Sequence, residues 1–183
     1  MQSSKARTIC RIALLAALYV LLNNTIAFKV GTIRITFASL PVVVAALLFG
    51  PGEAALTALT GELINQLYSY GMSATLFLWL IPPMVRGSLV GLAAARLRGT
   101  ERPLERRPAL AYTVCVGAAV ITTAVNTAVM AADALLMGYF TWVYVFGRLA
   151  ERLISGVVVA VVVTTAALPL TVQLRKTKLA EKG

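Results

Sequence analysis

The sequence contains no histidine, and only 13% of its 183 residues are charged. The lack of histidine removes the commonest general base and metal ligand, which excludes Ser-His-Asp and Cys-His catalysis and histidine-bound zinc. The two cysteines, Cys10 and Cys115, are too few for a disulfide framework or a four-ligand metal site. We therefore expect no metal and no other cofactor.

Acidic residues are scarce and hydrophobic residues abundant. Seventeen Lys and Arg oppose seven Asp and Glu, and 59% of the chain is hydrophobic. A soluble domain has about 25% charged residues and less than half apolar ones. This composition predicts an all-α, polytopic membrane protein.

Apolar runs divide the chain into six predicted transmembrane helices, since a helix needs about 20 apolar residues to cross a bilayer. The connections are short, so residues 1–183 are expected to form a single membrane domain. The first run resembles a signal peptide but is longer than one, so we expect it to be retained. The predicted helices cover about residues 8–28, 36–50, 53–70, 76–97, 109–137 and 143–174.

Positive charges predict the orientation, because Lys and Arg accumulate in cytoplasmic segments. Six spans place twelve of them on one side and only Lys29 and Arg34 in the opposite loops. Both termini are therefore predicted to be cytoplasmic, in the plasma membrane. The charge then reflects topology and contact with lipids, not nucleic-acid binding. The twelve are Lys5, Arg7, Arg11, Arg96, Arg98, Arg102, Arg106, Arg107, Arg175, Lys176, Lys178 and Lys182.

Four of the predicted helices each carry one polar stripe at helical spacing. Ionisable groups inside a membrane are costly and usually line a functional cavity. The stripes fall in the predicted outer halves, which indicates a ligand pocket open to the outside and closed beneath. Its candidate ligand-binding residues are Glu62, Asn65, Gln66, Trp79, Arg86, Asn126, Asp133, Arg148, Glu151 and Arg152.

These polar residues have structural explanations as well. Arg148, Glu151 and Arg152 can neutralise one another at a helix start, and Asn65 and Gln66 can join helices by hydrogen bonds. An interfacial belt explains most of the aromatic residues at the predicted outer interface, which are Tyr68, Tyr70, Trp79, Tyr139, Trp142 and Tyr144. Arg86 is the best candidate for ligand binding, because it lies beside the predicted mid-helix break at Pro82-Pro83.

Four short stretches carry a family resemblance. The sequence resembles the substrate-binding S component of energy-coupling factor (ECF) vitamin transporters, particularly the folate-type group, over residues 8 to about 100. Arg34 and Phe37, in the first stretch, complete the candidate ligand-binding residues. The stretches are RITFASLP (34–41), LFGP (48–51), GELINQL (61–67) and LIPPMVRG (80–87).

The resemblance implies a bacterial or archaeal subunit that captures a micronutrient outside the cell and is not an enzyme. Its implied partners are a transmembrane coupling subunit and two ATPase subunits. Ala13 and Ala17 match the first-helix motif that contacts the coupling subunit, although such small pairs also serve internal packing. This chain itself has no nucleotide-binding G-x-x-x-x-G-K-[ST] motif.

The ligand is predicted from the same residues. Glu62 or Asp133 can accept hydrogen bonds from the N–H edge of a 2-amino-4-oxopyrimidine ring, and Trp79, Tyr68 or Phe37 can stack on it. An arginine can pair with a carboxylate tail, as folate has. A folate-like pterin is therefore favoured, with a queuosine precursor of the 7-deazaguanine type as the alternative.

Functions of other classes fit less well. A membrane scaffold of cell-wall machinery has similar size and helix number but does not need four converging polar stripes. A secondary transporter or channel predicts an inverted repeat or polar cytoplasmic halves. An intramembrane enzyme is disfavoured by the lack of histidine and of paired aspartates at catalytic spacing.

Overall fold

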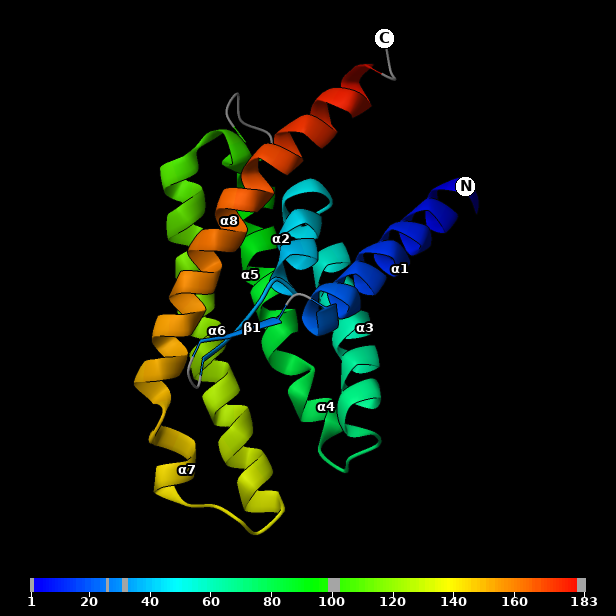
Figure 1. The fold of residues 1–183 in the computed structure, drawn as a ribbon. Coiled ribbons are helices and arrows are strands. Elements are labelled where there is room, and N and C mark those ends of the chain that lie inside the picture. The colour runs from blue at the N-terminus through cyan, green and yellow to red at the C-terminus, as the bar shows by residue number, and fades with distance from the viewer. Residues whose placement is uncertain (1, 26, 31–32, 99–102, 181–183) are drawn as a thin grey trace.

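The computed structural model describes residues 2–25, 27–30, 33–98 and 103–180, with the side chains of residues 5–25, 36–98 and 103–176. Helices form nearly all of this part, as predicted, and pack into an elongated bundle (Figure 1). The elements are α1 (Gln2–Thr25), β1 (Ala27–Val30), β2 (Ile33–Thr36), α2 (Ser39–Leu48), α3 (Pro51–Tyr70), α4 (Leu76–Trp79), α5 (Ile81–Leu97), η1 (Leu104–Arg106), α6 (Pro108–Leu136), α7 (Trp142–Phe146) and α8 (Leu149–Ala180).

A short β-hairpin follows α1, where the sequence predicted the end of one helix and the start of the next. Strands β1 and β2 are antiparallel, with Ala27 opposite Thr36. The second strand is rich in β-branched residues, which favour extended structure over helix. The first helix ends at Thr25, ahead of the hairpin, rather than at Phe28 as predicted. The hairpin returns the chain across the bundle, where β2 contacts α8 (Figure 1).

Proline marks the start of three helices. Pro51 opens α3 after Gly50, whose φ of +112° suits glycine, and Pro108 opens α6. The fourth predicted helix is in two parts, α4 and α5, and Pro82 lies in the first turn of α5. The predicted break at the proline pair is therefore present, but the two prolines lie in the first turn of α5 rather than in the middle of a helix. A first-turn proline costs no hydrogen bond, because that N–H has no partner within the helix.

Four described segments are long and apolar enough to cross a membrane: Lys5–Thr25, Leu76–Leu97, Pro108–Met137 and Trp142–Lys176. Helix α2 is apolar but has only 10 residues. Six spans and cytoplasmic termini stay predictions. The start of α1 and the end of α8 lie together at one end of the bundle, which we call the termini end, and α4 and α7 lie at the other, the α7 end (Figure 1).

The main core lies toward the termini end. It joins the second half of α2, the end of α5, η1, the first half of α6 and the second half of α8 through small and branched apolar side chains. Close packing here depends on glycine: a Cβ on Gly91 would lie only 2.5 Å from the Cα of Pro51. The core includes Val43, Val44, Leu47, Val90, Ala94, Leu104, Ala111, Cys115, Val163 and Ala167.

Arginines close the termini end over the last turn of α2. Arg175 donates to the carbonyl of Leu47 (3.3 Å) and pairs with Glu105 at 2.7 Å. Arg98 donates to the carbonyl of Phe49 at 3.2 Å. Cations at a helix C-terminus bind its free carbonyls and complement its dipole. Three elements distant in sequence are thereby attached to one helix end.

Candidate functional site

A hollow with two chambers lies between the helices on the α7 side of the core. The inner chamber has a volume of about 350 Å³ and the outer chamber about 980 Å³. The chambers share lining residues from α1, β2, α3, α4 and α6, so they form one continuous space. The shared residues are Asn23, Thr36, Glu62, Trp79 and Asn126.

Polar side chains of α1 and α3 form one wall. The hydroxyl of Tyr19 donates to Glu62 at 2.5 Å, and the amide of Gln66 donates to the other carboxylate oxygen at 2.7 Å. Asn23 donates to Asn65 at 2.6 Å. The wall therefore presents a carboxylate that neutral donors already hold in place.

A glycine allows this wall to form. A Cβ on Gly61 would lie 2.8 Å from the ring of Tyr19, closer than real contacts allow. The tyrosine ring therefore lies directly on the α3 backbone, one residue before Glu62. This close approach sets the position of the phenol against the carboxylate.

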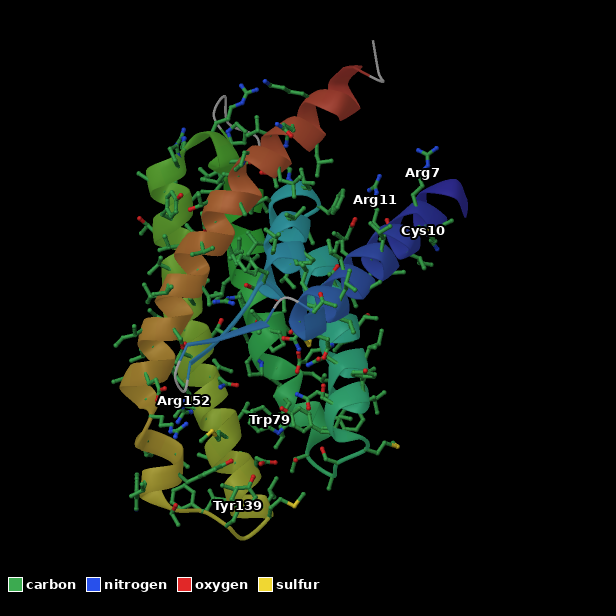
Figure 2. All side chains as sticks on the ribbon, viewed as in Figure 1. Arg7, Cys10, Arg11, Trp79, Tyr139 and Arg152 are labelled. Atoms are coloured by element: carbon green, nitrogen blue, oxygen red, sulfur yellow. The ribbon has the colours of Figure 1, made fainter. Side chains whose placement is uncertain are left out.

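The outer chamber is bordered by the end of α6 and the segment that follows it. The hydroxyl of Tyr139 donates to the carboxylate of Asp133, and its ring meets that of Tyr144 edge-on at 5.3 Å. Figure 2 shows Tyr139 at the α7 end, with Trp79 and Arg152 in the same half of the bundle. The hydrogen bond to Asp133 holds the pKa of Tyr139 well above its ordinary value, because it stabilises the protonated phenol.

Two arginines contribute to the inner chamber from opposite helices. Arg152 of α8 donates to the backbone carbonyl of Val145 and contacts the sulfur of Met130 at 3.3 Å. Arg86 of α5 has no hydrogen bond or salt bridge to any described residue. The inner chamber thus contains one anchored and one unengaged guanidinium group.

Most residues predicted for the site come together here. The ones that line a chamber come from five helices, although the sequence places them up to ninety residues apart. They are Glu62, Asn65, Gln66, Trp79, Arg86, Asn126, Asp133 and Arg152.

The other four predicted residues, Arg34, Phe37, Arg148 and Glu151, are not among the described lining of either chamber. Phe37 packs against the apolar core. Arg148 precedes α8 rather than lying within a helix, and its side chain, 67% exposed, is 3.9 Å from Glu151. Neither residue of this pair lines a chamber. The side chain of Arg34 lies outside the part that the structure describes.

Several lining residues were not predicted. Tyr19 and Asn23 are polar positions four residues apart in an apolar run, and this helical spacing is the signal that could have identified them. Tyr139 and Tyr144 were assigned to an aromatic belt, and Ser39 carried no periodic signal at all. Their contribution follows from the path of the chain between helices.

A family comparison decides what kind of protein carries this hollow. The family model for the substrate-specific component of the ECF transporter matches residues 7–167. The chain belongs to this family.

The fold of this S component agrees with solved members. A structure described as the S component of a bacterial ECF transporter aligns over 93% of this chain and 98% of its own, with a TM-score of 0.63 and 20% identity. An S component for biotin from an ECF-type ABC transporter aligns over 91% and 93%, with a TM-score of 0.53 and 13% identity. No curated protein matches the sequence.

Membership of the S-component family makes the protein the substrate-specific membrane component of a transporter, and not an enzyme. The two-chamber hollow is the candidate for the substrate site. Ala13 and Ala17 are both exposed on α1, away from the hollow. Their predicted contact with a coupling subunit stays a prediction.

Proposed function

We propose that this S component captures its substrate in the two-chamber hollow, and that the substrate is a folate-like pterin. The observation that carries the proposal is the convergence of charged and amide side chains from α1, α3, α5, α6 and α8 around one space. Polar groups within apolar helices are costly and are retained where they line a functional cavity.

The chemistry of the lining suits a flat heterocycle with N–H donors and an acidic tail. Glu62 and Asp133 line the outer chamber, and carboxylate oxygens accept hydrogen bonds from N–H donors. Trp79 lines both chambers and offers an aromatic face for stacking. Arg86 and Arg152 offer guanidinium groups to a carboxylate.

A 7-deazaguanine of the queuosine-precursor type is the second candidate. It has the same N–H edge and flat ring, so Glu62, Asp133 and Trp79 suit it equally. It has no carboxylate for the arginines. The two candidates therefore differ in whether the inner chamber contributes charge pairing.

Transport requires partners under this proposal. ATP hydrolysis takes place in two ATPase subunits, and a transmembrane coupling subunit contacts α1 at Ala13 and Ala17. Small residues allow helices to approach closely in a membrane, which suits such a contact. The substrate-facing and partner-facing residues of α1 then lie on different faces of one helix.

The test is the thermal stability of the purified, detergent-solubilised protein against folate, other vitamins and 7-deazaguanines. A ligand that binds only the folded state raises the melting temperature, by the equivalent of about 2.7 kcal/mol at one hundred times its Kd. We expect folate to do so, and Glu62→Ala and Arg86→Ala to reduce the shift. Arg148→Ala is the matched control, because that side chain is exposed and lines neither chamber. Unchanged binding and uptake in both pocket variants would show that the hollow is not the substrate site.

A further inference from the structure

Arg86 differs from the other charged groups of the inner chamber. Glu62 accepts from Tyr19 and Gln66, and Arg152 donates to a backbone carbonyl, but Arg86 has no such partner among the described residues. Arginine stays protonated in proteins. An ionised group removed from bulk water is costly unless an opposite charge or hydrogen-bond acceptors compensate it. The described inner chamber thus has one guanidinium group whose bonding capacity is unused.

A second unused polar group lies on the neighbouring helix. Ser39 is the first residue of α2 and lines the same chamber, and its hydroxyl oxygen is buried with no hydrogen-bond partner among the described residues. Buried polar atoms are nearly always paired in native proteins. Ser39 also begins a ten-residue helix, so the positive end of the helix dipole lies beside it.

Helix packing brings these two groups to adjacent walls. Gly87 follows Arg86, and a Cβ built on it would lie 3.0 Å from a methyl group of Val42 and 3.0 Å from the carbonyl oxygen of Ala54. Val42 lines the chamber and lies one turn after Ser39, on the same face of α2. Helix α5 is therefore pressed against the face of α2 that carries Ser39.

The geometry points to an anion subsite at the inner end of the hollow, formed by Arg86 and by Ser39 at the start of α2, which binds a carboxylate group of the substrate. This inference rests on the proposed function and adds the ligand class and the position of its acidic group. The charge of the chamber agrees, because the described lining has two arginines and one glutamate. A guanidinium group pairs with a carboxylate through two parallel hydrogen bonds, and a serine hydroxyl can supply a third.

Equilibrium binding of folate to the purified full-length protein tests the subsite directly. We expect Arg86→Gln to weaken binding about 10- to 150-fold, the usual effect of losing hydrogen bonds to a charged group, and Ser39→Ala about 2- to 10-fold. Arg148→Gln should bind as the wild type does. Without ligand, Arg86→Gln should melt no lower than the wild type, because it removes an unpaired charge, whereas a structural role for Arg86 predicts a lower melting temperature.

A second experiment, which does not require the natural substrate to be known, separates this inference from the proposed function. Benzoate and uncharged benzamide are compared as stabilisers at constant ionic strength. We expect benzoate, but not benzamide, to raise the melting temperature of the wild type and of Arg148→Gln. Benzoate should have no such effect on Arg86→Gln. If benzoate has this effect but no vitamin or deazaguanine of the panel binds, the subsite is supported and the proposed function is overturned.

Two results would overturn the subsite. One is a benzoate effect that is absent from the wild type or equal in Arg86→Gln. The other is a substrate from the panel that binds Arg86→Gln and Ser39→Ala as tightly as the wild type, in which case capture in the hollow stands without the anion subsite.

Discussion

The two ends of the bundle are held together by different interactions. At the termini end, small apolar side chains from α2, α5, η1, α6 and α8 pack tightly, and Arg175 forms an ion pair above them with the buried carboxylate of Glu105. At the α7 end, α1, α3 and α6 meet around a hollow, and hydrogen bonds between polar side chains replace much of the apolar packing. Few buried apolar contacts mean low local stability. The difference suggests that the termini end supports the fold while the α7 end adapts to a ligand.

The largest expected effect comes from removing the ion pair between Arg175 and Glu105 at the termini end. The Glu105 side chain is 2% exposed, so Arg175→Met leaves a buried carboxylate without its charged partner, which typically costs about 3–5 kcal/mol. The free energy of unfolding in detergent measures the loss. Arg148→Met, which removes the exposed partner of a 3.9 Å pair, should cost less than about 1 kcal/mol. Equal losses in the two variants would remove the proposed contrast between the ends.

A smaller effect is expected from loosening the hydrogen-bonded wall of the hollow. Tyr19→Phe removes a hydrogen bond to the Glu62 carboxylate, worth about 1.5–3 kcal/mol, and loosens a wall of both chambers. We expect both the melting temperature and the substrate affinity to fall. Tyr112→Phe is the matched control, because its hydroxyl pairs with Thr165 at 2.8 Å outside either chamber. The control should leave affinity unchanged, and a similar loss of affinity there would argue against a specific role for Tyr19.

The smallest effect concerns pH. Because the pKa of Tyr139 is raised in the folded protein, its contribution to stability is complete below the ordinary tyrosine pKa of about 10. As the pH rises from there through the folded-state value, the unfolded chain binds fewer protons than the folded one, so the contribution is lost. Tyr139 is 43% exposed, so water competes for this bond, and Tyr139→Phe should lower stability by less than about 1 kcal/mol at neutral pH and flatten its decline above pH 10.

Thermal unfolding between neutral pH and about pH 11 measures this slope. Tyr68→Phe is the control, because that side chain is 77% exposed and lines neither chamber. The slope of the control should match the wild type. A Tyr139→Phe slope that also matches the wild type would mean that the bond to Asp133 does not contribute to stability.

Much of the site was predictable because polar residues within apolar helices stand out. Glu62, Arg86, Asn126 and Asp133 were identified from helical spacing and all line the hollow. Arg148 was misplaced, because composition alone does not locate the turn between α7 and α8.

The missed residues have two causes. The four-residue spacing of Tyr19 and Asn23 was overlooked beside an apolar run, whereas Ser39 lies at a helix start that the sequence pattern does not locate. The hairpin of β1 and β2 decides where α2 begins, and nothing in the helical periodicity indicated it. Such features depend on the path between helices rather than on the pattern within them.

The sequence by itself determined the membrane class, the helical fold, the breaks at proline and glycine, and the helix faces that carry polar groups, because composition and periodicity are local properties. Only the tertiary structure decided which of those faces meet. The close contacts at Gly61, Gly87 and Gly91 set the spacing and rotation of α1, α2, α3 and α5. These contacts lie between residues distant in the chain, so they alone determined that Arg86 and Ser39 share a chamber while Phe37 packs in the core.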